Sequence, residues 1–278
     1  MTTQAEKANA FRKLHEPGSC FVIPNPWDFG SARLLEHRGF KALASSSAGF
    51  AFSIAQSDLS ISKSSLMTHL SGLCQATSLP VSADLQNGFG NDPEDVAVTL
   101  LQAARTGIVG GSIEDASGAD GNPVYPLEFA AERIRQAAAG IASLGFKFTL
   151  TARAENYLYG RADLKDTIRR LQAYQQAGAD VLFAPGIKTR EEISEVLRCI
   201  DRPLNVLAGI TGMTLGVAEL RDLGVTRISL GGSLARAAYG ALLHAAAEVQ
   251  GQGTFGYVRD AASGQELNEI FSRPRTEP

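Results

Sequence analysis

Residues 80–90 read PVSADLQNGFG, a short apolar run that ends in polar residues and then in two glycines. Val81 and Ala83 suit a buried strand, and Asp84 stands where that strand would emerge. The glycines allow the backbone to turn close to a ligand. A carboxylate at the end of a buried strand is costly unless it is paired, hydrogen-bonded or bound to a metal. The stretch therefore indicates either a metal-binding loop or a strand whose final Asp caps the following helix.

The same alternation of a short apolar strand and a helix recurs along the chain. The expected strands cover residues 20–23, 41–44, 79–84, 108–114, 146–152, 180–183, 204–207 and 227–230. Helices are expected over residues 4–15, 30–37, 62–76, 93–105, 127–143, 162–177, 190–199, 214–223, 234–249 and 266–271. This order predicts all-parallel βα units, and eight of them in one domain predict an α/β fold of the (β/α)8 TIM-barrel type.

An open, doubly wound sheet is the alternative fold. It favours a glycine-rich phosphate turn after the first strand, where this chain instead has Pro24-Asn25-Pro26. No linker or internal boundary is visible. We therefore expect residues 1–278 to form a single barrel domain with a short N-terminal helix and a C-terminal helical tail.

Composition narrows the possible partners and the compartment. The net charge is −3 and no basic block is present, so nucleic acid is not an expected partner. No apolar run reaches the length of a membrane span, and the N-terminus lacks an apolar signal core. The three cysteines are too few and too scattered for a disulfide framework. A cytoplasmic protein without membrane contact is expected.

Polar residues gather at the predicted carboxyl ends of the strands, where barrel enzymes place their sites. Asp84, Glu114 and Arg153 follow three consecutive strands, which lie ~5 Å apart, so they can converge on one small ligand. Two facing carboxylates would repel each other, and a divalent cation removes that repulsion. An all-oxygen donor set suits Mg²⁺, whereas no histidine falls at a strand end to favour zinc. A buried ion pair between Glu114 and Arg153 is the alternative.

Four further strands carry candidate residues at or near their carboxyl ends. Residues 45–49, Ser-Ser-Ser-Ala-Gly, offer small side chains and backbone N–H groups that could hold a carboxylate, or they form a plain strand-to-loop junction. Trp27, the single tryptophan, either walls the pocket or packs against the rim. Asn205 lies just inside the seventh strand. Residues 231–233, Gly-Gly-Ser, resemble the phosphate cradle of many barrels, with tight packing at a turn as the alternative.

At this point the chain resembles the phosphoenolpyruvate mutase/isocitrate lyase superfamily. The resemblance runs from about Phe21 to Leu243. Its motifs, in order, are residues 24–28, 44–49, Asp58, 82–90, 112–115 and 151–155. It implies a barrel whose last helix is exchanged between subunits, a homodimer or homotetramer, bound Mg²⁺ and a small 2-oxo acid substrate. Members of this superfamily make or break C–C or P–C bonds beside the carbonyl group.

The resemblance also implies roles for individual residues. Asp84 matches the principal Mg²⁺ ligand, and Glu114 matches a carboxylate that holds Mg²⁺-bound water. Gln86 completes the implied metal site, although it stands where the superfamily usually has Asp or Glu. Arg153 matches the arginine beside the oxo and carboxylate oxygens of the substrate, and Asp58 matches a carboxylate near the reacting group. The substrate-binding residues so implied, together with the strand-end candidates, are Trp27, Ser46, Ser47, Ala48, Arg153 and Asn205.

The loop after Glu114 departs from the superfamily pattern. Residues 115–146 contain no Cys, Lys or His. Isocitrate and methylisocitrate lyases carry an acid/base cysteine in this loop, so the chain is not expected to be either enzyme. The mutase-type lysine is also missing, which disfavours phosphonopyruvate as substrate. Gly118 and Gly121 would let the loop at residues 115–125 close as a lid.

The predicted function is that of a Mg²⁺-dependent carbon–carbon lyase or hydrolase. It would cleave the bond next to the carbonyl of a small 2-oxo (di)carboxylate through an enolate, as an oxaloacetate-type hydrolase or decarboxylase. Arg153 would add positive charge where the enolate forms, and Asp58 would orient a water or act as general base. One alternative is a P–C hydrolase or mutase acting on phosphonopyruvate. Another is a barrel that binds a 2-oxo acid without turning it over, which the substitution at Gln86 favours.

Overall fold

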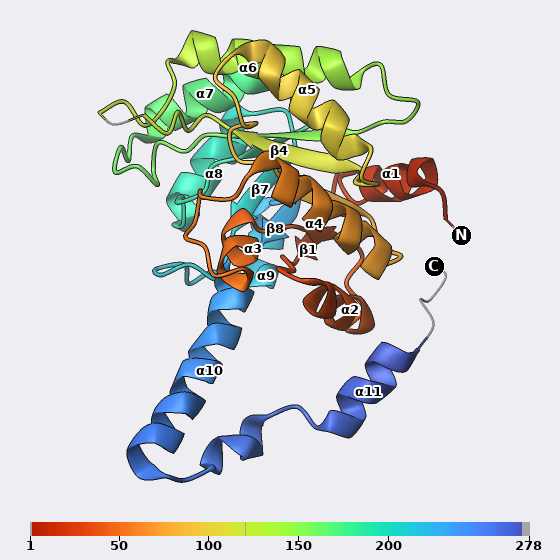
Figure 1. The fold of residues 1–278 in the computed structure, drawn as a ribbon. Helices are drawn as coiled ribbons and strands as arrows, with labels where there is room; N and C mark the ends of the chain where they lie inside the picture. The colour runs from red at the N-terminus through yellow and green to blue at the C-terminus, as the bar shows by residue number, and fades with distance from the viewer. Residues whose placement is uncertain (1, 120, 274–278) are drawn as a thin grey trace.

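Eight parallel strands form a nearly closed barrel in the computed structural model, which describes residues 2–119 and 121–273 (Figure 1). The strands are β1 (Phe21–Ile23), β2 (Leu43–Ala44), β3 (Val81–Asp84), β4 (Gly110–Glu114), β5 (Thr149–Arg153), β6 (Val181–Phe183), β7 (Leu204–Leu207) and β8 (Arg227–Ser229). Their order in the sheet is β1-β8-β7-β6-β5-β4-β3-β2. The backbone N–H of Ala44 donates to Pro24 O at 3.0 Å across the remaining gap. The predicted (β/α)8 barrel is confirmed.

Helices alternate with the strands and surround the barrel. They are α1 (Gln4–Lys13), α2 (Phe29–His37), α3 (Ser47–Ser53), α4 (Lys63–Ala76), α5 (Pro93–Ala104), α6 (Leu127–Ile141), α7 (Leu164–Gln176), α8 (Arg190–Cys199), α9 (Val217–Leu223), α10 (Ser233–Gln252) and α11 (Gly264–Ser272), with a 3₁₀ turn η1 (Gly256–Asp260). No helix within residues 2–119 or 121–273 has the length and apolar character needed to cross a membrane.

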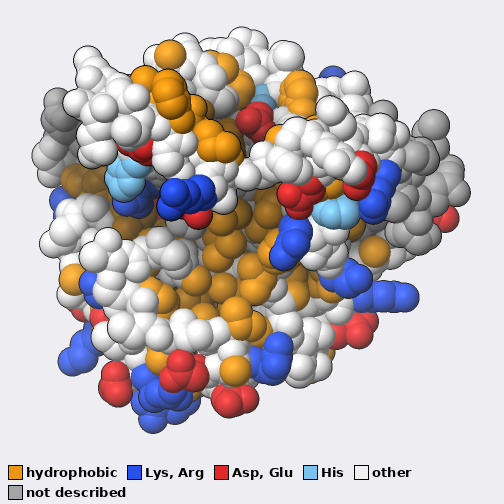
Figure 2. Space-filling view, turned by 90° about the horizontal axis from the view of Figure 1, so that it is seen from below, with side chains coloured by type: hydrophobic (Ala, Val, Ile, Leu, Met, Phe, Trp, Pro, Cys, Tyr) orange, Lys and Arg blue, Asp and Glu red, His pale blue; other side chains and the backbone are white. Residues whose placement is uncertain are grey.

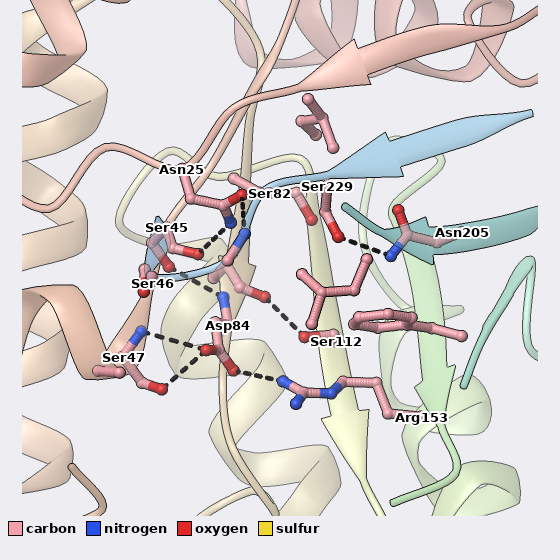
Figure 3. Close-up of a pocket in the computed structure, with 18 of the residues that line it drawn as sticks. Asn25, Ser45, Ser46, Ser47, Ser82, Asp84, Ser112, Arg153, Asn205 and Ser229 are labelled. Carbon is pink, nitrogen blue, oxygen red and sulfur yellow. Dashed lines mark hydrogen bonds and ion pairs between the residues drawn. The ribbon is translucent and has the colours of Figure 1, made fainter. Parts of the chain in front are cut away.

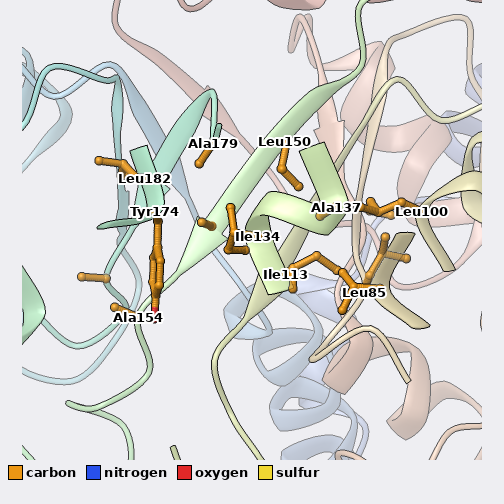
Figure 4. Close-up of a cluster of buried hydrophobic side chains, with 14 of the residues drawn as sticks. Leu85, Leu100, Ile113, Ile134, Ala137, Leu150, Ala154, Tyr174, Ala179 and Leu182 are labelled. Atoms are coloured by element: carbon orange, nitrogen blue, oxygen red, sulfur yellow. The ribbon is translucent and has the colours of Figure 1, made fainter. Parts of the chain in front are cut away.

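The main hydrophobic core lies between the strands and the outer helices. Leu85 and Ile113, from the β3–β4 side, pack near Leu100 of α5 and Ile134 of α6 (Figure 4). All four side chains are buried. Burying a side chain of this size contributes about 1.5–3 kcal/mol, so this layer holds the strands in the register that brings their carboxyl ends together.

Helix α1 covers the amino-terminal end of the barrel. Its Phe11 is fully buried and packs with Ile23 and Val109. Gly110 faces this ring: a Cβ at Gly110 would lie 2.9 Å from Phe11 Cε1, so the close approach requires glycine. The amide of Gln4 donates to the carbonyls of two residues at the α5–β4 connection, Ala104 and Ile108. The bottom of the barrel is therefore closed, and access is from the carboxyl end.

Helix α3 was not predicted from the sequence. Ser46 is its N-cap, and the Ser46 hydroxyl accepts a hydrogen bond from Gly49 N at 3.1 Å. The helix is short and contains serine and glycine, which have weak helix propensity, so pattern alone indicated a loop. Tertiary packing stabilises it: the ring of Phe50 stacks on His69 of α4 with centroids 3.9 Å apart.

His69 should make the protein less stable as the pH falls. Burial lowers the pKa of His69 from its ordinary 6.5 to about 4, with only Asp28 opposing, so the unfolded chain takes up this proton first. Neutral His69 therefore contributes its full share of the unfolding free energy above pH 6.5, and this share is lost as the pH falls from about 6.5 to about 4. His69→Phe keeps the stacked ring without the titration. Between about pH 7.5 and 5 the variant should gain about 2 kcal/mol over the wild type in urea unfolding, whereas a pH-independent difference would contradict this account.

Helix α10 leaves the barrel and projects from it (Figure 1). Ala235, in its first turn, is its single buried residue. The chain then returns through η1 to α11, where Arg33 of α2 donates to Arg273 O at 2.7 Å. Most of α10 therefore does not pack on the barrel of its own chain.

Candidate active site

A cavity of about 400 Å³ opens at the carboxyl ends of the strands. Figure 3 shows its polar lining, which comes from β3, β4, β5, β7 and β8 and from the segments that follow β1 and β2. Seven of the predicted site residues line it: Ser46, Ser47, Ala48, Asp58, Asp84, Arg153 and Asn205. Trp27, Gln86 and Glu114 stand behind this lining. A 400 Å³ cavity is within the range of small-molecule sites.

Asp84, the last residue of β3, is held on both of its oxygens. Oδ2 accepts from the backbone N–H of Ser47 at 3.1 Å and from its hydroxyl at 2.7 Å. Oδ1 accepts from Nη1 of Arg153 at 3.1 Å and from Gln86 N at 3.3 Å. The helix after this loop is capped by Asp92 instead, which occupies the N-cap of α5. Asp84 therefore does not cap that helix and instead lines the cavity.

Arg153, the last residue of β5, lies among three carboxylates. Its Nη1 is 3.1 Å from Asp84 Oδ1 and 3.2 Å from Glu114 Oε2, and its Nη2 is 2.9 Å from Glu155 Oε1. Burial would lower the pKa of Arg153, but these carboxylates raise it overall. The buried ion pair between Glu114 and Arg153, the alternative at the sequence level, is therefore present, and Arg153 also lines the cavity.

The carboxylates outnumber the cation that they share. Burial raises the pKa of Glu114 well above its usual value, and Glu155, Asp84 and Asp115 add to the shift while Arg153 opposes it. Burial likewise raises the pKa of Glu155. Burial therefore favours the protonated forms of Glu114 and Glu155, and a divalent cation beside them would favour the ionised forms instead.

The donor set fits Mg²⁺ better than a softer metal. Asp84 and Glu114 both lie within 3.2 Å of Nη1 of Arg153, so the two carboxylates are close neighbours. Among the described residues, no group of three or more His, Cys, Asp or Glu side chains is arranged to hold a metal. A Mg²⁺ ion held by Asp84 and Glu114 would take its other ligands from amide and water oxygens.

Gln86, two residues after Asp84, has a constrained backbone conformation. Its φ is +51°, in the left-handed region that non-glycine residues rarely adopt. The side chain is buried, and its Nε2 has no hydrogen-bond partner in residues 2–119 or 121–273. The carbonyl of Gln86 accepts from Glu114 N at 3.0 Å, which ties the loop after β3 to the end of β4.

The remaining predicted residues form the rim and the wall. Trp27 packs on the start of α3, where a Cβ on Gly49 would lie 2.9 Å from Trp27 Cβ. Asp58 is exposed at the mouth of the cavity and accepts from Leu59 N at 2.8 Å. Loss of water around the carboxyl of Asp58 raises its pKa, and Asp84 adds to this. Asn205 is buried in the wall and donates to Ser229 Oγ at 2.9 Å.

The loop after β4 is folded back on itself in the described residues. Ala116 and Val124 form an antiparallel bridge, and Ser117 N donates to Pro123 O at 2.8 Å. The hydroxyl of Tyr125 donates to Asn91 Oδ1 at 2.6 Å, which anchors the carboxyl end of this predicted lid. Asp120, within the lid, lies outside the described residues.

Two polar residues of the site had no assigned role at the sequence level. Asn25 accepts from Leu230 N and Gly231 N and donates to Ser45 O, so it joins the ends of β1, β2 and β8. Arg227 lines the inner end of the cavity. Its position could have been read from the alternation in Arg227-Ile228-Ser229, where the polar residues share one face of the strand.

The chain is similar in sequence to known proteins. Residues 11–250 match the family model described as phosphoenolpyruvate phosphomutase. An uncharacterized protein of Mycobacterium tuberculosis is 32% identical over 86% of this chain and 88% of its own. An oxaloacetate decarboxylase of Pseudomonas putida is 30% identical over 77% of this chain and 72% of its own.

Solved structures share the whole fold. A Burkholderia cenocepacia protein, provisionally described as a lyase/mutase, is 52% identical with a TM-score of 0.96, covering 98% of both chains. Oxaloacetate acetylhydrolase with its product oxalate is 25% identical with a TM-score of 0.85, covering 98% of this chain and 95% of that one. Phosphonopyruvate hydrolase with oxalate and Mg²⁺ is 26% identical with a TM-score of 0.84, covering 97% and 95%. This chain therefore belongs to the phosphoenolpyruvate phosphomutase family, within the phosphoenolpyruvate mutase/isocitrate lyase superfamily.

Proposed function

We propose that this protein is a Mg²⁺-dependent enzyme that cleaves the C–C bond beside the carbonyl of a small 2-oxo (di)carboxylate of the oxaloacetate type. One observation carries the proposal. A single nitrogen of Arg153 lies within 3.2 Å of Asp84 and Glu114, at the ends of three adjacent strands that border the 400 Å³ cavity. This is a paired cation and carboxylate site, buried enough to act on a charged small molecule.

The relatives support this choice of chemistry. Two of the proteins described above act on oxaloacetate by name, a decarboxylase and an acetylhydrolase. The phosphonopyruvate hydrolase structure contains Mg²⁺ and oxalate, a dicarboxylate. For the chain described here, Asp84 and Glu114 would hold Mg²⁺, and the backbone of Gln86 contacts both residues. When bound, Mg²⁺ would act as a Lewis acid on the substrate carbonyl.

The chain's own residues supply orientation and charge. The guanidinium of Arg153 is fixed by Glu155 and stacks over the ring of Phe183, 5.2 Å from its centroid. It would stabilise negative charge on the oxo oxygen as the C–C bond breaks. Ser46 and Ala48 border the cavity beside Asp84 and would position a substrate carboxylate. Asp58 at the mouth would hold or move a proton, since its raised pKa brings it nearer to neutrality.

The deciding experiment is a substrate panel followed by NMR. The protein would be incubated with Mg²⁺ and oxaloacetate, alkylated malates, phosphonopyruvate or 2-oxoglutarate, and again after removal of metal with EDTA. We expect C–C cleavage of one dicarboxylate, lost with EDTA and restored by Mg²⁺. Cleavage of phosphonopyruvate alone would replace the proposal with P–C chemistry, and metal-independent turnover would contradict it.

A second candidate is a 2-oxo acid-binding protein without turnover. The specific observation in its favour is Gln86, a neutral residue whose backbone contacts Asp84 and Glu114 and whose Nε2 has no partner among the described residues. A neutral ligand weakens the metal site. Thermal stabilisation by a panel compound, with no product from any of them, would favour this candidate over the enzyme.

We also propose that the protein is a homodimer or homotetramer built through α10. The helix and the turn after it expose large apolar side chains, including Leu242, Leu243, Phe255 and Val258. The face of the molecule that is seen from below in the orientation of Figure 1 is hollowed, and hydrophobic side chains line the hollow (Figure 2). Exposed apolar surface of this kind marks an interface. Sedimentation analysis should show at least a dimer, and a monomer would contradict this.

We further propose a cytoplasmic location. The unpaired Cys20, Cys74 and Cys199 suit a reducing compartment such as the cytoplasm.

A further inference from the structure

Arg227, the first residue of β8, is a buried cation without an acid. Its side chain lines the inner end of the cavity, and the residue is 5% exposed. Nε donates to Asn205 Oδ1 at 3.0 Å, and Nη2 donates to Thr151 Oγ1 at 3.0 Å. Nη1 is buried and has no hydrogen-bond partner within residues 2–119 and 121–273. Hydrogen bonds from Nε and Nη2 thus fix the guanidinium, and the N–H groups of Nη1 remain available to a ligand.

The surroundings of Arg227 are polar but uncharged. The cavity wall near it is formed by Ser82, Ser112 and Ser229, where barrels usually carry bulky branched residues. Burial lowers the pKa of Arg227 to about 9, so it remains charged at neutral pH. His15 lies close enough for Arg227 to help lower the pKa of its ring, after burial, to about 3, so His15 is neutral. A buried charge without a counter-ion is costly, and an anion would remove that cost.

The spacing between Arg227 and Arg153 limits the length of a ligand that could contact both. Thr151, which binds Nη2 of Arg227, is two residues before Arg153 on β5. Residues two apart in a strand share one face and are ~7 Å apart. Both arginines line one cavity, so a single short ligand can contact both.

We propose that the inner end of the cavity is an anion subsite, in which Arg227, held by Thr151 and Asn205, receives the second carboxylate of a dicarboxylic 2-oxo acid. The first carboxylate and the oxo group lie toward Arg153. This assignment rests on the proposed function and narrows it to dicarboxylates. A free small anion such as chloride offers the same chemistry, and the experiments separate the two sources.

The first experiment compares matched ligands by calorimetry in the presence of Mg²⁺. 2-Oxoglutarate and 2-oxopentanoate differ only in a carboxylate against a methyl group, and oxaloacetate and 2-oxobutyrate form the shorter pair. In the wild type the diacid should bind more tightly than its monoacid. Arg227→Met should weaken diacid binding by about 10- to 100-fold and leave monoacid binding within about twofold. Arg227→Lys should recover part of the loss, because it keeps the charge without the planar fork.

The matched control is Arg198→Met, which removes an exposed arginine paired with Glu195 on α8. It should leave both affinities unchanged. Full diacid preference in Arg227→Met would overturn the proposal. Loss of both diacid and monoacid binding, with an unchanged melting temperature, would also overturn it, because Arg227 would then serve the whole pocket.

The second experiment needs no variant and does not depend on turnover. Crystals of the wild-type protein in bromide should show an anomalous peak beside Arg227, displaced when a diacid is added. A peak together with unchanged diacid preference in Arg227→Met would assign the subsite to a free anion and overturn the substrate role. A water in place of bromide, bridging Arg227, Thr149 and His15, would overturn the anion subsite itself. If no panel compound is turned over, the proposed function fails while a bromide peak still supports the subsite.

Discussion

Asp84→Asn should lower kcat/KM for the dicarboxylate substrate by about 1,000-fold, the loss of roughly 4 kcal/mol of transition-state stabilisation. The two oxygens of Asp84 accept hydrogen bonds from opposite sides, Oδ2 from Ser47 and Oδ1 from Arg153. An amide has one acceptor and one donor, so one side would face N–H against N–H. The substitution also removes a negative charge from the metal position. Steady-state kinetics with varied Mg²⁺ would measure both effects.

The control for Asp84→Asn is Asp222→Asn, an exposed carboxylate on α9 that does not line the cavity. It should leave kcat/KM within about twofold, since isolated surface substitutions have small effects. The apparent Mg²⁺ affinity should fall in Asp84→Asn and stay constant in Asp222→Asn. If Asp84→Asn stays folded and retains wild-type turnover, both the metal assignment and the proposed mechanism are wrong.

The fold was readable from the sequence where periodicity and burial coincide. β7 (Leu204–Leu207) and α8 (Arg190–Cys199) have the bounds that the pattern predicts. β4 and β5 begin later than predicted, at Gly110 and Thr149. Ile108 and Phe148 precede these starts and are buried, so hydrophobicity marks them as strand although the ladder has not begun. Where pairing starts depends on the register of the neighbouring strand, which a local pattern does not contain.

Residues of the candidate site could be predicted from the sequence where a charged side chain stands at the end of a buried strand. Asp84, Glu114 and Arg153 were expected to converge because each follows a strand, and the structure places them within one ion-pair cluster. The double hydrogen bond from Ser47 to Asp84 could not be expected, because it depends on α3, which tertiary packing stabilises. Arg227 is the first residue of β8, so the pattern of polar residues at the carboxyl ends of the strands does not include it, although its side chain lines the cavity.

A second buried network holds the ends of β4 and β5 together behind the site. Asp115 accepts from Glu155 N at 2.7 Å through Oδ1, and from Arg170 Nη1 at 2.9 Å and Tyr174 hydroxyl at 2.5 Å through Oδ2. Burial raises the pKa of Asp115, while Tyr174, Glu155 N and Arg170 oppose the shift. Arg170 also binds the carbonyl of Tyr125 at 2.9 Å, which connects the network to the base of the lid.

Asp115→Asn should therefore destabilise the fold by about 3 kcal/mol, measured by urea unfolding, because removing one partner leaves the others buried and unsatisfied. The new amide can still accept from Glu155 N, but its N–H₂ then faces the donors of Arg170 and Tyr174. Asp166→Asn is the matched control. Asp166 pairs with the same Arg170 at 2.7 Å but is more exposed, with 24% of its side chain accessible, and should cost about 1 kcal/mol or less. Equal losses in the two variants would contradict this account, because the buried carboxylate would then contribute no more than the exposed one. A loss confined to Asp115→Asn would show that burial sets the energy of this network, which joins the ends of β4 and β5 next to Glu114 and Arg153.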